Sequence, residues 1–273
     1  MAFQKATVKQ ARARVALIGG AGSGKTYSAL KVATHLVAPT KGRIAVIDTE
    51  RGSASKYAKE FAFDVNELTH FSIEDYVKAI EEAGAAKYDC LVIDSMSHEW
   101  VGKGGALEEV DRVGGGNKFT NGWSKVTPKH TRFIDTVLSF PGHVIGTVRQ
   151  KMDYVIEEKD GKKIPRKIGL GPVQRDGMEF EFDVVGDLDL DNCLRISKTR
   201  CSALRDAVID KPGKGLADAL LAWLSEGEPY VAPVAPTLPP SALVNGGVAL
   251  AEEIRGAKSI LELEGLLPAI GKR

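Results

Sequence analysis

The sequence predicts an α/β fold built around a mainly parallel central sheet, with a short helical tail at the C-terminus. Short apolar runs of strand length alternate with longer segments of helical spacing, which is typical of parallel strands joined by crossover helices. A glycine-rich loop follows the first apolar run and precedes the first helical segment. The 273 residues are 43% hydrophobic and 27% charged, a composition that indicates a globular domain rather than a disordered chain.

The elements of the first half follow one another in the order strand, helix, strand. The run at 90–94 is apolar throughout, which is typical of a parallel strand covered on both faces. Strands are predicted at residues 14–18, 44–48, 90–94 and 143–148. Helices are predicted at residues 25–37, 53–61, 73–84 and 128–138, with room for a short strand between the second and third, and with Pro128 opening the last.

The second half of the chain predicts antiparallel pairing. Residues 153–168 alternate weakly around Lys159-Asp160-Gly161-Lys162, which is a hairpin turn signal. The remaining elements are an antiparallel pair at 180–188 and 193–197 and a final amphipathic helix at 216–224.

The composition changes after residue 227. Five prolines lie between positions 229 and 240, which is typical of a semi-rigid linker. The residues that follow have helical spacing but are too few to form a core alone. The prediction is therefore a main domain at 1–227, a proline-rich linker at 228–241 and a short helical tail at 242–273.

The glycine-rich loop fits the pattern G-x-x-x-x-G-K-[ST] of a phosphate-binding loop, and it lies between a strand and a helix as that motif requires. Its glycines let backbone N–H groups surround phosphate oxygens, and the helix N-terminus adds partial positive charge. The lysine is expected to contact the β- and γ-phosphates, and the threonine hydroxyl to bind Mg²⁺. The loop consists of Gly19, Gly20, Ala21, Gly22, Ser23, Gly24, Lys25 and Thr26.

Two carboxylates complete the expected nucleotide site. Leu91-Val92-Ile93-Asp94 places Asp94 at the C-terminal end of an apolar strand, beside the expected Mg²⁺ ion. Hydrolysis also needs a group that activates water. Glu50 follows the strand at 44–48 and is the preferred candidate, while Glu99 is the alternative. The sequence thus predicts a site for ATP and Mg²⁺ in which Lys25 and Glu50 are catalytic.

These motifs and their spacing resemble the core of RecA-type recombinases over about residues 12 to 205. Tyr57 follows Glu50 by seven residues, the spacing at which that family has a tyrosine that stacks on adenine. Asp94-Ser95 matches the end of the family's Walker B strand, and residues 144–151 resemble the strand that ends in its nucleotide-sensing residue. The resemblance implies that Tyr57 contacts adenine and that Thr147 takes the sensor position, where the family usually has glutamine.

The same resemblance implies an assembly of identical subunits. Lys198-Thr199-Arg200 is similar to the basic pair that contacts the γ-phosphate of the neighbouring subunit, so Lys198 and Arg200 are expected to be catalytic in trans. The chain also resembles short phage-encoded RecA-like ATPases of recombination and single-strand annealing. That likeness implies a homo-oligomeric ring or filament, single-stranded DNA as partner, and a place in the cytoplasm of a bacterial host.

Two segments are expected to contact nucleic acid. Residues 114–123 are polar and basic, contain aromatic side chains suited to stacking on bases, and occupy the position of the family's first DNA loop. Residues 149–175 occupy the position of the second, with cations suited to phosphates and with acids that offset part of their charge. The candidate residues are Lys118, Phe119, Trp123, Lys151, Lys162, Lys163, Arg166 and Lys167.

The charge, the hydropathy and the cysteine content limit which other kinds of partner or site are expected. A net charge of +1 means that any affinity for nucleic acid must be local. No apolar run is long enough to span a bilayer, so no membrane partner is expected. The three cysteines, Cys90, Cys193 and Cys201, form no C-x-x-C pair, so zinc and redox motifs have no support.

Several alternatives share a phosphate loop. A helicase or DNA-packaging motor has the same core, whereas a small-molecule kinase needs arginine-bearing lids that the sequence does not suggest. A GTPase needs N-K-x-D, and Asn117-Lys118-Phe119-Thr120 has threonine in place of the aspartate. A non-enzymatic alternative is an ATP-gated scaffold that recruits a single-strand-binding protein through the tail.

Overall fold

The computed structural model describes residues 11–115, 121–159 and 162–226. The chain divides into two units, Met1–Ala232 and Pro233–Arg273, and all described residues belong to the first. The predicted linker at 228–241 and tail at 242–273 lie outside the described residues. Among the residues that are described, no helix is long and apolar enough to cross a membrane.

The central sheet has the order β3-β2-β4-β5-β1-β7-β8-β9, and β6 pairs with β5 off this path. All neighbours from β3 to β7 run parallel, while β8 and β9 extend one edge in antiparallel pairing. The predicted α/β fold class with a mainly parallel sheet is therefore confirmed. The strands are β1 (Arg14–Gly19), β2 (Ile44–Asp48), β3 (Asp64–Glu67), β4 (Cys90–Asp94), β5 (His143–Lys159), β6 (Lys162–Pro172), β7 (Val184–Leu188), β8 (Cys193–Thr199) and β9 (Val208–Asp210).

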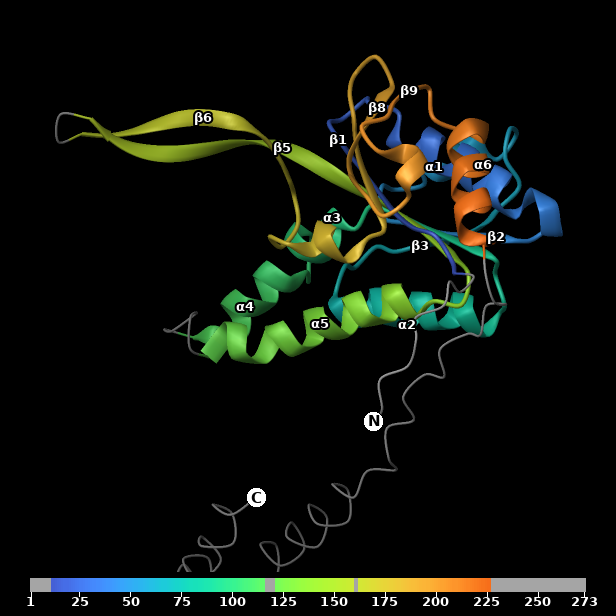
Figure 1. The fold of residues 1–273 in the computed structure, drawn as a ribbon. Helices are drawn as coiled ribbons and strands as arrows, with labels where there is room; N and C mark the ends of the chain where they lie inside the picture. The colour runs from blue at the N-terminus through green and yellow to red at the C-terminus, as the bar shows by residue number, and fades with distance from the viewer. Residues whose placement is uncertain (1–10, 116–120, 160–161, 227–273) are drawn as a thin grey trace, which may run out of the picture. The chain divides into compact units, whose positions relative to one another are not determined.

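Helices cover both faces of the sheet (Figure 1). In β1, Val15 and Leu17 join the apolar core under α1 and α6, while Ala16 and Ile18 join the core under α2 and α5. A strand whose successive side chains point to opposite faces must be apolar throughout when both faces are covered. The helices are α1 (Lys25–Val37), α2 (Ile73–Ala85), α3 (Ser97–Val101), α4 (Ala106–Gly114), α5 (Trp123–Ser139) and α6 (Lys214–Leu224).

The local sequence explains why α2 begins and packs where it does. The Ser72 hydroxyl accepts a hydrogen bond from the Asp75 N–H at 3.1 Å, which caps the helix. Glu74 and Asp75 lie in the first turn, where negative charge favours the helix dipole. One face of α2 is apolar at helical spacing and buried against the sheet, and it includes Ile73, Tyr76, Val77, Ile80 and Ala83.

The structure differs from the prediction in four places. The strand expected at 180–188 begins only at Val184, because Met178–Glu181 form a 3₁₀ turn. α5 begins at Trp123, so Pro128 lies inside the helix rather than at its start. Proline removes one helical hydrogen bond, but buried residues on both sides of it, Val126 and Phe133, hold the helix on the sheet. The helix expected at 53–61 is only a 3₁₀ turn at Ala54–Tyr57. The short elements α3, α4 and β9 were not predicted.

β5 continues well beyond the sheet. It pairs with β1 as far as Arg149, and from Gln150 onward it pairs with β6. The two strands form a long hairpin that projects away from the helices (Figure 1). The predicted hairpin is confirmed, and it begins closer to the sheet than its sequence pattern indicated.

Candidate active site

The carboxyl ends of four neighbouring strands meet at one edge of the sheet. In the register, Asp48 of β2 lies beside Asp94 of β4, and Gly19 of β1 lies beside Arg149 of β5. Ligands of open α/β sheets bind at this edge. A cleft of about 480 Å³ opens there, and its walls include the phosphate loop and the two preferred carboxylates of the sequence analysis.

The phosphate loop lies between β1 and α1, as predicted. Gly22 and Gly24 have φ angles of 82° and 81°, a left-handed region that favours glycine. α1 begins at Lys25, so the positive end of its dipole faces the loop. The Lys25 ammonium donates a hydrogen bond to the Gly20 carbonyl at 2.7 Å, and burial lowers the pKa of Lys25. An anionic phosphate is a stronger acceptor than this carbonyl, so the loop suits a bound phosphate.

Thr26 and Asp94, the two predicted Mg²⁺ ligands, lie in contact in the wall of the cleft. The Thr26 hydroxyl donates a hydrogen bond to Asp94 Oδ2 at 2.6 Å. Asp94 is only 1% exposed, and burial raises its pKa although two hydroxyl donors act against this. A hydroxyl and a carboxylate oxygen in contact are hard ligands that suit Mg²⁺. Within the described ranges no three His, Cys, Asp or Glu side chains are grouped to hold a metal.

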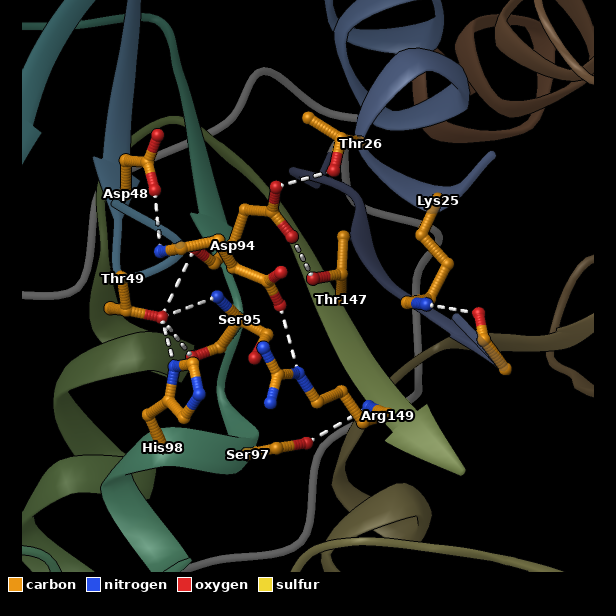
Figure 2. A network of polar contacts seen from close by, with 12 residues as sticks. Lys25, Thr26, Asp48, Thr49, Asp94, Ser95, Ser97, His98, Thr147 and Arg149 are labelled. Atoms are coloured by element: carbon orange, nitrogen blue, oxygen red, sulfur yellow. Dashed lines mark hydrogen bonds and ion pairs between the residues drawn. The ribbon is translucent and has the colours of Figure 1, made fainter. Parts of the chain in front are cut away.

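Thr147 does not line the cleft, so the sensor position that the resemblance implied for it is corrected. Thr147 is fully buried, and its hydroxyl donates a hydrogen bond to Asp94 Oδ1 at 2.5 Å. Asp94 is therefore held between the Thr26 and Thr147 hydroxyls (Figure 2). The reason is the strand register, since Thr147 pairs with Leu17 inside the sheet while Arg149 pairs with the last residue of β1.

Removing the Thr147 hydroxyl is expected to weaken Mg²⁺-dependent nucleotide binding. Thr147→Val keeps the side-chain volume but loses one charge-assisted hydrogen bond to Asp94, which corresponds to about a 3- to 10-fold higher dissociation constant for Mg²⁺-ADP. Thr147→Ser keeps the hydroxyl and should bind nearly as the wild type does. Titration calorimetry compares the two variants, and equal affinities would contradict a role for this hydrogen bond.

Glu50 lines the cleft together with Arg149, which sequence reasoning missed. Arg149 Nε donates a hydrogen bond to Glu50 Oε1 at 2.9 Å. Burial acts to raise the pKa of Glu50, but the hydrogen bond and charge of Arg149, with His98 and Lys25, outweigh it and lower the pKa. Glu50 is therefore an ionised carboxylate, the form that aligns and activates water. The two side chains are 27% and 43% exposed, so both are accessible to a ligand.

Buried polar groups fix the backbone around Glu50 in the loop after β2. Asp48 is fully buried, and its carboxylate accepts hydrogen bonds from the Glu50 N–H at 2.6 Å and the Ala54 N–H at 2.8 Å. The Thr49 hydroxyl oxygen accepts a hydrogen bond from the Ser95 N–H at 2.8 Å (Figure 2). The loops after β2 and β4 are thus tied together, which fixes Glu50 relative to Asp94.

Glu99, the alternative water-activating group, lies outside the cleft. It is fully buried, with Oε1 at 3.1 Å from His130 Nδ1 and Oε2 accepting a hydrogen bond from Gln174 Nε2 at 3.1 Å. These partners lie on α5 and on the segment after β6, so Glu99 ties together elements behind the site. Of the two carboxylates that the sequence offered, Glu50 is the one that faces the nucleotide cleft.

Tyr57 lines the end of the cleft beyond the phosphate loop, together with Tyr27 and Ser53. The Tyr27 and Tyr57 rings lie 5.6 Å apart, edge to face, which gives this end an apolar wall. Such a wall suits a nucleotide base, and stacking of adenine on Tyr57 stays a prediction.

The predicted nucleic-acid residues fall into three groups. Trp123 packs on Trp100 of α3 with ring centroids 5.6 Å apart, so its place in a free DNA loop is corrected to a place against the core. Lys151 is exposed on β5. Lys118 and Phe119 lie outside the described residues. Lys162, Lys163, Arg166 and Lys167 lie on the backbone of β6, and their side chains lie outside the described ones.

The two expected trans residues are not part of the chain's own cleft. β8 runs antiparallel to β7, so Lys198 and Arg200 lie toward the opposite edge of the sheet from the phosphate loop. Lys198 Nζ donates a hydrogen bond to the Phe182 carbonyl at 2.6 Å, and Arg200 donates one to Asp183 Oδ1 at 2.7 Å. Their action on a neighbouring subunit stays a prediction.

Known proteins resemble the described part of the chain. The profile of a family described as an AAA domain matches residues 11–207, which include the phosphate loop, both cleft carboxylates and Arg149. No curated protein matches the chain in sequence. Among the matching solved structures, the crystal structure of a KaiC-like protein from the hyperthermophilic archaeon Pyrococcus horikoshii OT3 has 19% sequence identity and a TM-score of 0.40, over 68% of this chain and 78% of that chain.

Proposed function

The chain belongs to the AAA domain family, and from this premise we propose that it is a Mg²⁺-dependent ATPase whose hydrolysis is coupled to single-stranded DNA through the β5–β6 hairpin. A nucleotide-binding ATPase domain follows from the family and from the phosphate loop. Coupling to DNA, and use in phage recombination, annealing or repair, are the finer parts of the proposal. Their main support is the continuity of β5 between the nucleotide cleft and the hairpin.

Each residue of the cleft has a separate role in ATP hydrolysis. Backbone N–H groups of the loop and Lys25 hold the phosphates, while Thr26 and Asp94 hold Mg²⁺, which neutralises phosphate charge when bound. Glu50 aligns water for attack on the γ-phosphate, and Arg149 stabilises the charge that develops on it. Each group lines the same cleft, so the reaction needs no large movement of the core.

β5 connects this chemistry to the hairpin without a break. Arg149 contacts Glu50 in the cleft, and the next residue, Gln150, begins the pairing with β6. The Gln150 side chain also donates a hydrogen bond to Asp187 Oδ1 at 3.0 Å, which anchors the base of the hairpin on β7. When a γ-phosphate competes with Glu50 for the Arg149 guanidinium, the change occurs one residue from the hairpin base. Nucleotide state and hairpin position are coupled by this adjacency.

The composition of β6 suits a polyanion. Between Lys162 and Pro172 the sequence has four cations and no acid, whereas the acids of the hairpin lie on β5 and in the turn. The register sets Lys163 opposite Glu158 but Lys167 opposite Tyr154 and Arg166 opposite Val155. Cations next to an aromatic residue are the combination that binds phosphates and stacks on bases in single-stranded nucleic acid.

Assembly into a ring or filament is part of the proposal. Lys198 and Arg200 lie away from the chain's own phosphate loop, so any γ-phosphate that they contact must be bound to a neighbouring subunit. In such an assembly the hairpins of successive subunits form a repeated binding surface along one strand of DNA.

The hairpin should bind single-stranded DNA more tightly when ATP is present. A triple variant, Lys162→Glu, Lys163→Glu and Lys167→Glu, is expected to lose at least about 10-fold in affinity for an oligonucleotide at low salt, because three phosphate contacts are removed. Fluorescence anisotropy with a labelled single strand measures this, with and without a slowly hydrolysed ATP analogue.

A matched control reverses three exposed lysines away from the hairpin, Lys41, Lys59 and Lys78, which gives the same change in net charge. Equal losses in the two triple variants would mean that the affinity is nonspecific charge attraction. If the affinity of the wild type for single-stranded DNA does not depend on nucleotide, the coupling through β5 is contradicted and a different binding partner for the ATPase is favoured.

A further inference from the structure

A turn that is distant in the sequence from the phosphate loop packs directly on it. The turn between β7 and β8 ends at Asn192, whose φ angle of 62° lies in the left-handed region that asparagine tolerates better than most residues. Its N–H donates a hydrogen bond to the Asp189 carbonyl at 3.2 Å, and its carbonyl accepts one from the Lys211 N–H at 3.0 Å. The Asp189 carboxylate also accepts a hydrogen bond from the Cys193 N–H at 2.8 Å, so the turn is held from both sides.

The amide side chain of Asn192 contacts the loop at two points. Nδ2 donates a hydrogen bond to the Ser23 carbonyl at 3.0 Å, across 169 residues of sequence. The same nitrogen lies so close to Gly24 that a Cβ there would approach it to 2.9 Å. Gly24 is therefore required for two independent reasons, its φ angle of 81° and the space that the Asn192 amide occupies.

The contact fixes the direction of a phosphate-binding group. A trans peptide is planar, and its C=O and N–H point in opposite directions. Because Asn192 holds the Ser23 carbonyl on the side of the β7–β8 turn, the Gly24 N–H of the same peptide points to the other side. The cleft is lined by Gly24, and an N–H group in the first turn of a helix has no partner within the helix. The group is thus free to donate to a phosphate oxygen.

We propose that Asn192 is a positioning residue for the phosphate loop, which presets the Ser23–Gly24 peptide so that the Gly24 N–H donates to a nucleotide phosphate. The inference rests on the proposed nucleotide-binding function and adds to it an element from outside the loop motif. Asn192 does not touch the nucleotide. It acts by lowering the reorganisation that the loop needs when phosphate binds.

The test separates the amide from the backbone. Asn192→Gly keeps the left-handed conformation and removes only the side chain, whereas Asn192→Asp keeps the shape but cannot donate and adds negative charge. Asn192→Gly is expected to raise the dissociation constant for ADP about 3- to 10-fold, the value of one hydrogen bond, while binding of adenosine is unchanged. Asn192→Asp should weaken ADP further, and added salt should recover part of that additional loss.

Leu190→Gly in the same turn is the matched control, since Leu190 is 74% exposed and the change places a glycine in the turn without removing the Asn192 amide. This control should bind ADP as the wild type does, and all variants should keep the wild-type circular dichroism spectrum. In steady-state hydrolysis, Asn192→Gly should raise KM more than it lowers kcat.

Wild-type affinity for ADP in Asn192→Gly would overturn the proposal, as would an equal loss for ADP and adenosine, which indicates a general distortion of the cleft. Failure of the wild-type chain to bind ADP is a different result, because it would contradict the nucleotide site itself and with it the proposed function.

Discussion

Glu50→Gln is expected to lower kcat for ATP hydrolysis by about 10²- to 10⁴-fold, the usual contribution of a positioned general base. The carboxylate lines the cleft at the end of β2, and its pKa is lowered by Arg149, so it is ionised when the nucleotide binds. Glutamine keeps the shape and the contact with Arg149 but cannot take a proton. ATP should therefore remain bound, and KM should change little.

Single-turnover hydrolysis assays with Glu50→Gln distinguish a loss of the chemical step from a loss of ATP binding. Glu67→Gln is a suitable control, because Glu67 is an exposed carboxylate on the neighbouring strand β3. Hydrolysis by Glu50→Gln at the wild-type rate would remove Glu50 from the mechanism, and since Glu99 is buried behind the site, water activation would then require a group from another subunit.

Arg149→Ala is expected to lower kcat by about 10³-fold, within the range for arginines that stabilise a transferring phosphoryl group. Arg149 is placed between Glu50 and the base of the hairpin, so the variant should also lose the effect of nucleotide on DNA affinity. Arg149→Lys should recover part of the rate but not all, because lysine lacks the planar fork of donors. Arg132→Ala, which removes an exposed arginine paired with Glu81 on the helical face, is the control.

Arg149→Ala should also change the pH dependence of the residual activity. Arg149 lowers the pKa of Glu50, so its removal raises that pKa. Glu50 works as the ionised carboxylate, and the variant should therefore lose activity at a higher pH than the wild type as the pH falls. Rates measured between about pH 4 and 8 cover the ordinary range of a carboxylate pKa and would show the difference. Coincident profiles together with a wild-type rate would place Arg149 outside the reaction.

Local motifs were enough to find the centre of this site. The phosphate loop and Asp94 are recognisable because each is a short pattern attached to one strand, and the position of the strand end gave Glu50. The α/β fold class followed in the same way, from apolar runs whose length and continuity are typical of buried parallel strands.

The residues that sequence reasoning misplaced depend on register or on distant partners. Thr147 was expected to face the nucleotide, but pairing of β5 with β1 places it behind Asp94 and brings Arg149 to the cleft instead. Trp123 was expected in a loop because it ends the glycine-rich polar segment at 114–123, and its packing on Trp100 is a tertiary contact that this local pattern does not indicate. Asn192 was expected only as part of the turn between two antiparallel strands, and no sequence pattern indicated its contact with Ser23, which lies 169 residues away.

The most direct measurement is ATP hydrolysis by the purified chain with and without single-stranded DNA, at low salt so that phosphate contacts persist. We expect slow hydrolysis by the chain alone, a several-fold higher rate with DNA, and no hydrolysis with or without DNA in Lys25→Ala, which lacks the lysine that contacts the phosphates. Hydrolysis that depends on Lys25 but is the same with and without DNA would contradict the proposed coupling, even though the ATPase site itself would stand.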